Sequence, residues 1–178
     1  MAINETTKEK HIKNKDIKIR TNIIVVSDSL SSMTEQERKL KDRSSKIAVQ
    51  QLMENGCEVN NIRYCPDEIE LIRKLVNDGI DNGIELIITI GGTGIAQRDV
   101  TIEAVEVLLA KKLPGYGELF RHLTYQEVGT VSIMTRAIAG VNKNSVIVCL
   151  PGSPNAVRLG VSLILKEIIH IQNLLAKK

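Results

Sequence analysis

Hydrophobic and polar residues follow two alternating periods along the chain, and the changes of period predict a series of strands and helices. Five short runs have the alternating or wholly apolar pattern and the β-branched residues that are typical of strands. These runs are Ile19–Val26, Glu58–Tyr64, Glu85–Ile90, Ala137–Val141 and Ser145–Leu150. The run from Glu85 is almost entirely apolar, as expected of a strand that helices cover on both faces.

Apolar residues spaced three and four positions apart predict helices in most of the segments between and after these strands. The expected helices are Lys46–Asn55, Asp67–Ile80, Thr101–Ala110, Glu118–Tyr125 and Asn155–Leu175. Ser44 and Ser45 precede the first helix and can cap it, and Asp67 with Glu70 has the spacing of a capping box. The polar segment Ser27–Arg43 predicts a loop.

Strands that alternate with helices predict an α/β fold of three layers, with helices on both faces of a mostly parallel sheet. Ligands bind to such sheets outside the carboxyl ends of the strands, where the strand order changes direction. We therefore expect the functional residues in the loops that leave the strands. The sequence predicts one domain over residues 19–178, preceded by a flexible basic tail over residues 1–18.

The basic excess of the sequence lies in this expected tail. The whole chain has a formal charge of +3, and its first 20 residues contain six Lys and Arg against three Asp and Glu. The rest of the chain contains 18 of each sign, so the folded body is formally neutral. The charge therefore gives no reason to expect nucleic acid as a partner. We interpret the tail as solubilising, and a weak contact with an acidic partner is the alternative.

Composition excludes several other classes of protein. The chain has 178 residues, and its longest stretch without a charged residue has 14 residues, two of them proline. The sequence therefore predicts no membrane span and no signal peptide. Its three cysteines are far apart, which indicates reduced thiols and a cytoplasmic protein. Only four residues are aromatic, too few to form a stacking platform for single-stranded nucleic acid.

The strongest chemical signal is a glycine-rich loop that directly follows the apolar strand. Gly91, Gly92, Thr93 and Gly94 separate this strand from the next helical pattern. Glycine lets the backbone approach a ligand and turn its N–H groups toward an anion, and Thr93 adds a hydroxyl donor. The loop matches neither the Walker A nor the dinucleotide-binding pattern. A tight turn without a ligand is the alternative, but three glycines so close together favour a phosphate site.

Two aspartates occupy equivalent places, each between a strand and the helix that follows it. Asp67 and Asp99 could each cap a helix, and Thr101 could cap the second helix instead. Because the loops that precede these helices leave the same edge of a parallel sheet, we expect both carboxylates beside the glycine loop. Mg²⁺ binds to one or two carboxylates together with phosphate oxygens and water. Asp67 and Asp99 are therefore candidate ligands of Mg²⁺.

Three further segments contribute candidate ligand contacts. Gly152 and Ser153 follow the last strand, where Ser153 also suits the N-cap of the final helix. Arg136 lies in a short polar link before a strand, and it is the arginine that we expect to hold a phosphate. Glu118 follows an expected turn at Pro114–Gly117. It is either a charge stabilised by the helix dipole or a polar ligand contact.

Seven motifs along the chain resemble those of the MoaB/MogA family of molybdenum-cofactor biosynthesis proteins. The resemblance covers residues 20–175, and the motifs occur in the order of the family. The matching segments are Val25–Asp28 (VVSD), Pro66–Glu68 (PDE), Gly91–Gly94 (GGTG), Arg98–Thr101 (RDVT), Pro114–Glu118 (PGYGE) with Phe120 and Arg121, Thr135–Ala137 (TRA) and Leu150–Pro154 (LPGSP).

The resemblance implies a molybdopterin-binding fold that assembles as a homotrimer or a homohexamer. It also implies an activity, molybdopterin adenylyltransferase: molybdopterin and ATP, with Mg²⁺, give adenylyl-molybdopterin and pyrophosphate. A partner protein then inserts molybdate or tungstate into the product. The family has its catalytic carboxylates in the PDE and RDVT motifs, which correspond to Asp67 and Asp99 in this chain. Ser27 and Asp28, in the first motif, are expected to contact a substrate.

Two positions depart from the pattern of the family. Ser29 stands where the first motif usually continues with Arg, and Ser45 replaces Gly in the usual D-x-S-G pattern at Asp42–Ser45. These changes affect the expected contacts of the first loop with the pterin and leave the nucleotide side as it is in the family. The alternative function is a molybdopterin carrier or scaffold without catalysis, in which Asp67 and Asp99 act only as helix caps.

Overall fold

The computed structural model describes residues 18–177, so the expected tail lies almost entirely outside the described residues. Six strands form one sheet in the order β2-β1-β3-β6-β5-β4. The strands are β1 (Arg20–Val26), β2 (Glu58–Cys65), β3 (Leu86–Ile90), β4 (Lys111–Lys112), β5 (Ile138–Asn142) and β6 (Ser145–Leu150). Neighbours among β2, β1, β3 and β6 pair in parallel, and β5 pairs antiparallel with both β6 and β4. The expected mostly parallel sheet is confirmed.

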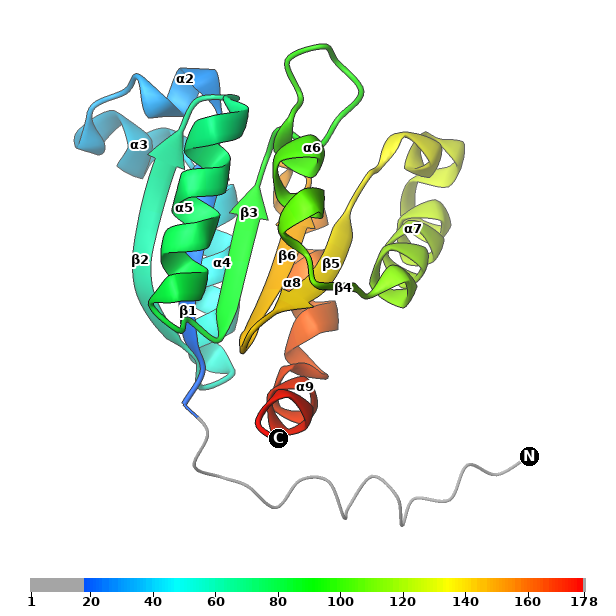
Figure 1. Ribbon diagram of the computed structural model, residues 1–178. Coiled ribbons are helices and arrows are strands. Elements are labelled where there is room, and N and C mark those ends of the chain that lie inside the picture. Colours follow the sequence, from blue (N-terminus) through cyan, green and yellow to red (C-terminus); the bar gives the residue numbers. More distant parts are fainter. Residues whose placement is uncertain (1–17, 178) are drawn as a thin grey trace.

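Helices cover both faces of the sheet, which confirms the three-layer α/β fold (Figure 1). The first face is covered by α4 (Ser44–Glu54), α7 (Pro114–Val128), α8 (Pro154–Leu165) and α9 (Ile168–Leu175). The second face is covered by α5 (Ile69–Asp81) and α6 (Thr101–Val105). Successive strand residues point to opposite faces, so Ile23 of β1 packs in the first core and Ile24 in the second. Among the described residues, no helix is long and apolar enough to cross a membrane.

The order of the strands changes direction at β1. From β1 the chain passes over the first face through α4 to β2, and it returns over the second face through α5 to β3 on the other side of β1. The loops after β1 and β3 therefore leave the sheet toward opposite faces. This arrangement is the switch point at which α/β sheets bind ligands. Ser27 and Gly91 begin the two loops.

The polar segment that we expected to be a loop contains two short helices, so that expectation is wrong. α2 (Asp28–Ser31) and α3 (Glu35–Lys41) bury none of their side chains, and therefore no apolar periodicity marks them in the sequence. α3 nevertheless begins with a capping box between Thr34 and Glu37. That T-x-x-E signal is visible in the sequence and would have predicted the helix.

Three other boundaries differ from the expectation. The final helix is interrupted at Lys166–Glu167, but its buried stripe continues from α8 into α9, so periodicity does not reveal the break. The helix that begins at Thr101 gives way to a 3₁₀ turn at Glu106–Leu108, and the chain then enters β4. A two-residue strand is too short to show a period. Pro114 is the first residue of α7, so the expected turn at 114–117 is the first turn of that helix.

The expected caps of α4 and α8 have different outcomes. α4 begins at Ser44, and the carboxylate of Asp42 accepts the backbone N–H of Ser45 at 2.9 Å, so the expected serine cap is wrong. Asp42 is the stronger acceptor because it carries a full charge near the positive end of the helix dipole. Ser153 does cap α8, since its hydroxyl oxygen accepts the backbone N–H of Ala156.

The PGYGE segment connects α7 to the rest of the fold. The hydroxyl of Tyr116 donates to the carbonyl oxygen of Gly160 in α8 at 3.0 Å, and the Tyr116 ring stacks on Phe120. Gly117 allows α7 to lie close to β5, because a Cβ there would stand 2.7 Å from the carbonyl oxygen of Ala137. Part of this motif is therefore explained by packing.

Replacing Tyr116 by Phe is expected to lower the free energy of unfolding by about 1 kcal/mol, since it leaves the Gly160 carbonyl without this donor. Denaturant unfolding measures the change. Tyr125→Phe is the matched control, because the Tyr125 side chain lies in the same helix and is 56% exposed. Equal losses in the two variants would contradict a specific role for the Tyr116 hydroxyl.

Candidate functional site

The glycine loop after β3 has a backbone that favours glycine at two positions. Gly91 and Gly92 have φ angles of +102° and +60°. A Cβ at Gly91 would lie 2.2 Å from the carbonyl oxygen of Val26 in β1. A Cβ at Gly92 would lie 2.5 Å from the Asp67 carboxylate and 2.4 Å from the Thr101 hydroxyl. The loop is therefore pressed against β1 on one side and against polar side chains on the other.

Thr101 anchors this loop to the start of α6. Its backbone N–H donates to the carbonyl oxygen of Gly92, and its hydroxyl donates to that of Gly91, both at 2.9 Å. The N–H of Gly91 in turn donates to the carbonyl oxygen of Leu150 at the end of β6. The Thr101 side chain is completely buried and does not cap α6, so that alternative is wrong.

Asp67 lies in the link between β2 and α5, but it does not cap the helix. α5 begins at Ile69, and no side chain caps it, so the expected capping box is wrong. The carboxylate turns instead toward Gly92. Its Oδ1 is buried and has no hydrogen-bond partner among the described residues. The backbone N–H of Asp67 donates to Oδ1 of Asp28 at 3.1 Å, which brings Asp28 to the same place.

Asp99 lies against another part of the glycine loop. Its Oδ2 accepts the backbone N–H of Ala96 at 2.8 Å, and its own N–H donates to the Ala96 carbonyl oxygen at 2.9 Å. A Cβ at Gly94 would lie 2.6 Å from this carboxylate. Val100 occupies the N-cap position of α6, without a side-chain cap, so Asp99 is not a helix cap either. The two aspartates thus contact the loop at Gly92 and at Gly94.

The charges around the loop perturb Asp67. Burial raises the pKa of the Asp67 carboxyl, and the nearby negative charges of Asp28 and Asp99 raise it further, while Arg98 lowers it. A carboxylate that is partly buried among like charges is stabilised by an added cation. Within residues 18–177, no group of three or more His, Cys, Asp and Glu side chains could hold a metal ion. The protein would therefore supply few of the ligands of a bound cation, the free Oδ1 of Asp67 among them. This fits Mg²⁺, which takes its other ligands from water and phosphate.

A cavity of about 460 Å³ lies on the first face, beside the same loop. Gly91 lines it, together with Ser44 at the start of α4 and Pro154 at the start of α8. Two helix N-termini therefore border the cavity, and both favour a bound anion. Lys41 and Arg43 also line it and add positive charge. The volume is within the range of sites that bind small molecules.

The loop after β6 and the loop after β1 meet at this cavity. The hydroxyl of Ser44 donates to the carbonyl oxygen of Gly152 at 2.6 Å. A Cβ at Gly152 would lie 3.6 Å from the Cα of Gly91, so a side chain as small as that of alanine would reach the glycine loop there. Ser153 follows Gly152 and caps α8, and Ser27 lines the cavity from the end of β1. The structure therefore brings these expected ligand contacts to one edge of the sheet.

Asp42 also lines this cavity and organises it, a role that we did not predict from the sequence. Its side chain is only 3% exposed, and its carboxylate accepts hydrogen bonds from Ser45 and from the hydroxyl of Tyr64. Ser45, one of the two departures from the family pattern, donates both its N–H and its hydroxyl. The departure therefore adds a hydrogen bond to this carboxylate.

Arg136 and Glu118 have different relations to the site. The guanidinium of Arg136 donates to the backbone carbonyl oxygens of Thr93 and Asp99, both at 3.2 Å, and it forms an ion pair with Glu103. The hydrogen bond from Arg136 lowers the pKa of the Glu103 carboxyl. Glu118 lies exposed on α7, and its side chain makes no hydrogen bond or ion pair among residues 18–177. The structure therefore joins Arg136 to the loop and leaves Glu118 unbonded to it.

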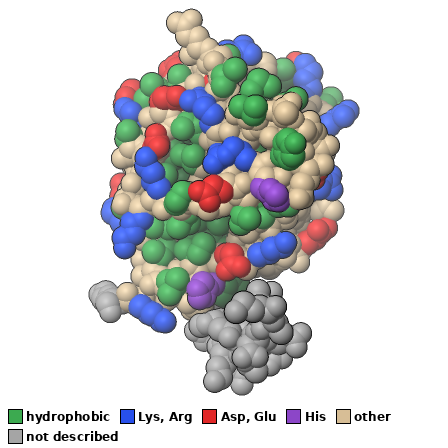
Figure 2. Space-filling model, turned by 90° about the vertical axis from the view of Figure 1, so that its right-hand side faces the viewer, with side chains coloured by type: hydrophobic (Ala, Val, Ile, Leu, Met, Phe, Trp, Pro, Cys, Tyr) green, Lys and Arg blue, Asp and Glu red, His purple; other side chains and the backbone are tan. Residues whose placement is uncertain are grey.

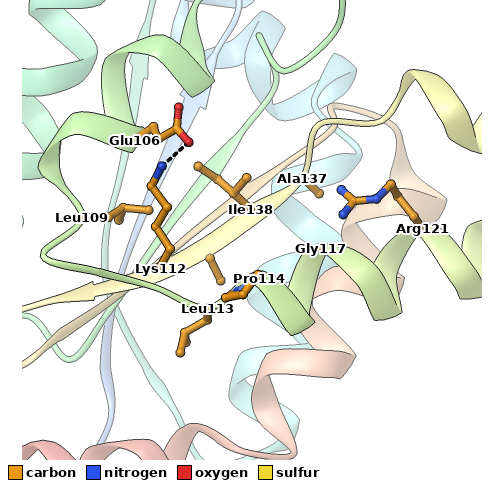
Figure 3. Close-up of a pocket in the computed structure, with 10 residues that line it drawn as sticks. Glu106, Leu109, Lys112, Leu113, Pro114, Gly117, Arg121, Ala137 and Ile138 are labelled. Carbon is orange, nitrogen blue, oxygen red and sulfur yellow. Dashed lines mark hydrogen bonds and ion pairs between the residues drawn. The ribbon is translucent and has the colours of Figure 1, made fainter.

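A second cavity, of about 210 Å³, lies between α7, β4 and β5 (Figure 3). Its walls are mainly apolar, an ion pair between Lys112 and Glu106 borders it, and the guanidinium of Arg121 points toward Gly117 and Ala137. Neither the glycine loop nor the aspartates line this cavity. It is therefore not part of the candidate site.

Comparison with known proteins gives a match to a family over most of the chain. The family is described as a probable molybdopterin binding domain, and it matches residues 22–170. Molybdenum cofactor biosynthesis protein B of Staphylococcus aureus (strain Mu50) is 39% identical over 163 residues, 89% of this chain and 93% of that protein. The protein of the same name from Staphylococcus epidermidis is 48% identical over 122 residues, 66% of this chain and 69% of that protein.

Solved structures give a consistent result. A crystal structure of a molybdenum cofactor biosynthesis protein B superposes with a TM-score of 0.84 at 37% identity, covering 93% of this chain and all of that chain. The tungsten cofactor synthesizing protein MoaB from Pyrococcus furiosus superposes with a TM-score of 0.79 at 32% identity, covering 90% of this chain and 98% of that one. The similarity therefore extends over nearly the whole length of both structures.

Proposed function

The chain belongs to the molybdopterin-binding MoaB/MogA family of molybdenum-cofactor biosynthesis proteins, and from this we propose that it is a molybdopterin adenylyltransferase. It transfers the adenylyl group of ATP to the terminal phosphate of molybdopterin and releases pyrophosphate. One observation carries the proposal: the buried Oδ1 of Asp67 lies without a hydrogen-bond partner against a glycine loop that Asp99 also contacts. Neither carboxylate has the capping role that would explain it without a ligand.

The chemistry asks the protein to align two anions. The terminal phosphate of molybdopterin is largely a dianion at neutral pH, because the second pKa of a phosphate monoester is about 6. One of its oxygens attacks the α-phosphorus of ATP, so that a new P–O bond forms while the bond to pyrophosphate breaks. The nucleophile needs no general base. The remaining tasks are to position the two groups and to neutralise charge as pyrophosphate leaves.

The glycine loop divides the site into two parts that suit these tasks. On the first face, the cavity bordered by the N-termini of α4 and α8 suits the phosphate end of one substrate. On the second face, Asp67 and Asp99 suit Mg²⁺ that is bound to the phosphates of ATP. When bound, Mg²⁺ supplies the positive charge that stabilises the departing pyrophosphate. Gly91 and Gly92 hold the backbone between the two parts.

Measuring pyrophosphate release from molybdopterin and Mg-ATP tests this proposal. An adenylyltransferase releases one pyrophosphate for each adenylyl-molybdopterin formed, and it releases none when either substrate is left out. The alternative, a molybdopterin carrier or scaffold, retains molybdopterin and releases no pyrophosphate. Binding of molybdopterin without turnover would therefore support the carrier and reject the enzyme.

We also propose that the chain forms a homo-oligomer, a trimer or a hexamer, and passes its product to a protein that inserts molybdate or tungstate. The α7 side of the molecule, shown in Figure 2, exposes apolar side chains among charged ones. Those of α7 and the following 3₁₀ turn (Gly129–Met134) are Leu119, Tyr125, Val128, Val131, Ile133 and Met134. Exposed apolar surface of this kind favours protein–protein contact. Sedimentation velocity gives the oligomeric state directly.

A further inference from the structure

We infer that Arg136, paired with Glu103, positions Asp99 beside the glycine loop and does not bind a phosphate. The inference rests on the proposed function, because it concerns a carboxylate that we propose as a Mg²⁺ ligand. It assigns Glu103, which no motif singles out, to the machinery of the site.

The contacts of Arg136 show what its guanidinium holds together. Nε donates to the carbonyl oxygen of Thr93, and Nη2 donates to that of Asp99, each at 3.2 Å. The segment between these residues is exposed, with Ile95 71% exposed. Among residues 18–177, Arg136 is the only side chain from outside the segment 91–101 that forms hydrogen bonds with residues 93–99. It therefore spans the two ends of an otherwise self-contained loop.

Glu103 fixes the guanidinium in this position and neutralises it. Both Nη atoms of Arg136 donate to the Glu103 carboxylate, which lies on α6. This two-point pairing matches the planar fork of arginine and sets its orientation as well as its place. The pair adds no net positive charge for an incoming phosphate. A phosphate would have to displace Glu103 to gain the full attraction of the guanidinium.

The position of Asp99 follows from these contacts. Its backbone carbonyl is held by Arg136, and its Oδ2 is held by the N–H of Ala96. The other carboxylate oxygen remains for a ligand. A displacement of about 1 Å in such a group can reduce the rate of reaction about 100-fold. Losing Arg136 frees the loop at both ends and moves the carboxylate relative to Asp67.

Arg73 offers a control, because it also combines an ion pair with two hydrogen bonds to backbone carbonyls, and its carbonyl acceptors lie on α6. It pairs with Glu70 and donates to the carbonyl oxygens of Glu103 and Ala104. The side chains of Arg73 and Arg136 are 32% and 31% exposed. Arg73 thus holds α5 to α6 and has no bond to the loop. General destabilisation of α6 affects both variants, whereas mispositioning of Asp99 affects only one.

The experiment compares Arg136→Gln with Arg73→Gln by two measurements. The first is hydrogen exchange at the Ala96 amide in the protein without ligands, where we expect Arg136→Gln to raise the rate at least about tenfold and Arg73→Gln to leave it unchanged. The second is adenylylation kinetics, where we expect Arg136→Gln to lower kcat about 10- to 100-fold with KM for ATP within about threefold of the native value. Arg73→Gln should keep the native kcat.

Arg136→Lys separates positioning from phosphate binding. Lysine keeps the positive charge but lacks the fork that joins two carbonyls and a carboxylate, so we expect the same defect as with Gln. Recovery of activity by Lys, together with a raised KM in Arg136→Gln, would overturn the inference. So would an unchanged exchange rate at Ala96. If the native protein releases no pyrophosphate, the proposed function fails, and the exchange measurement still decides whether Arg136 positions the loop.

Discussion

Replacing Asp67 by Asn is expected to reduce adenylylation at least about 100-fold and at the same time to make the protein more stable. A 100-fold loss corresponds to roughly 2.7 kcal/mol of transition-state stabilisation. The loss arises because the amide oxygen of Asn carries no full charge and binds Mg²⁺ poorly. Molybdopterin binding should change little, because we assign the phosphate end of molybdopterin to the cavity, which Asp67 does not line. Equal loss of adenylylation and molybdopterin binding would count against the metal role.

The gain in stability follows from the raised pKa of Asp67. Burial and the charges of Asp28 and Asp99 make the folded protein bind the Asp67 proton more tightly than the unfolded chain does. Ionised Asp67 therefore destabilises the fold at pH values above its folded pKa, and this cost disappears as pH falls below the pKa of the unfolded chain. At pH 7 we therefore expect Asp67→Asn to raise Tm. The difference should shrink as the pH is lowered from 7.5 toward 4.5.

Asp78→Asn is the matched control for this variant. Asp78 lies on the same helix that Asp67 precedes, and its side chain is exposed. We expect this change to leave both the rate and Tm unaltered. A rise in Tm for both variants would show that the gain comes from the net charge of the chain and not from the surroundings of Asp67.

Strand positions were predictable wherever burial covers a whole run. Ser145–Leu150 is buried at every residue and has the predicted bounds. β4 was not predictable, because its two exposed residues form a strand only through their pairing with β5. The helices α2 and α3 bury no side chain and so lack an apolar stripe, and only the capping box of α3 marks either of them in the sequence. Periodicity therefore misses structure that buries nothing, and it misses a strand such as β4 that depends on a partner distant along the chain.

The candidate site was predictable in its location and not in its contacts. Parallel strands bring the loops that follow them to one edge, so the meeting of Asp67 and Asp99 with the glycine loop follows from the order of elements. Whether either aspartate caps a helix depends on the exact residue at which the helix begins. A sequence pattern does not locate that boundary to better than one or two residues. Arg136 shows the same limit. Its place near the loop is evident from the sequence, but its pairing with Glu103 depends on how α6 meets β5.

Replacing Gly91 by Ala is expected to lower the free energy of unfolding by at least about 3 kcal/mol. Two costs add at this residue. Its φ of +102° is unfavourable for any residue with a side chain, and the new Cβ would stand 2.2 Å from the carbonyl oxygen of Val26. The measurement is denaturant unfolding at equilibrium. Because the loop must move away from β1, adenylylation should fall in the fraction that remains folded.

Gly56→Ala separates these two costs. Gly56 has a similar positive φ of +76°, but a Cβ there would have no atom within 4 Å. This control should cost only about 1–2 kcal/mol, the ordinary penalty of a left-handed backbone. The difference between the two variants then measures the collision with Val26 together with the additional backbone strain of a φ of +102°. That collision involves a backbone oxygen of the central sheet, so truncating a neighbouring side chain cannot relieve it. Equal costs at Gly91 and Gly56 would mean that the loop has room to move away from β1, and the close contact would lose its role in holding the site.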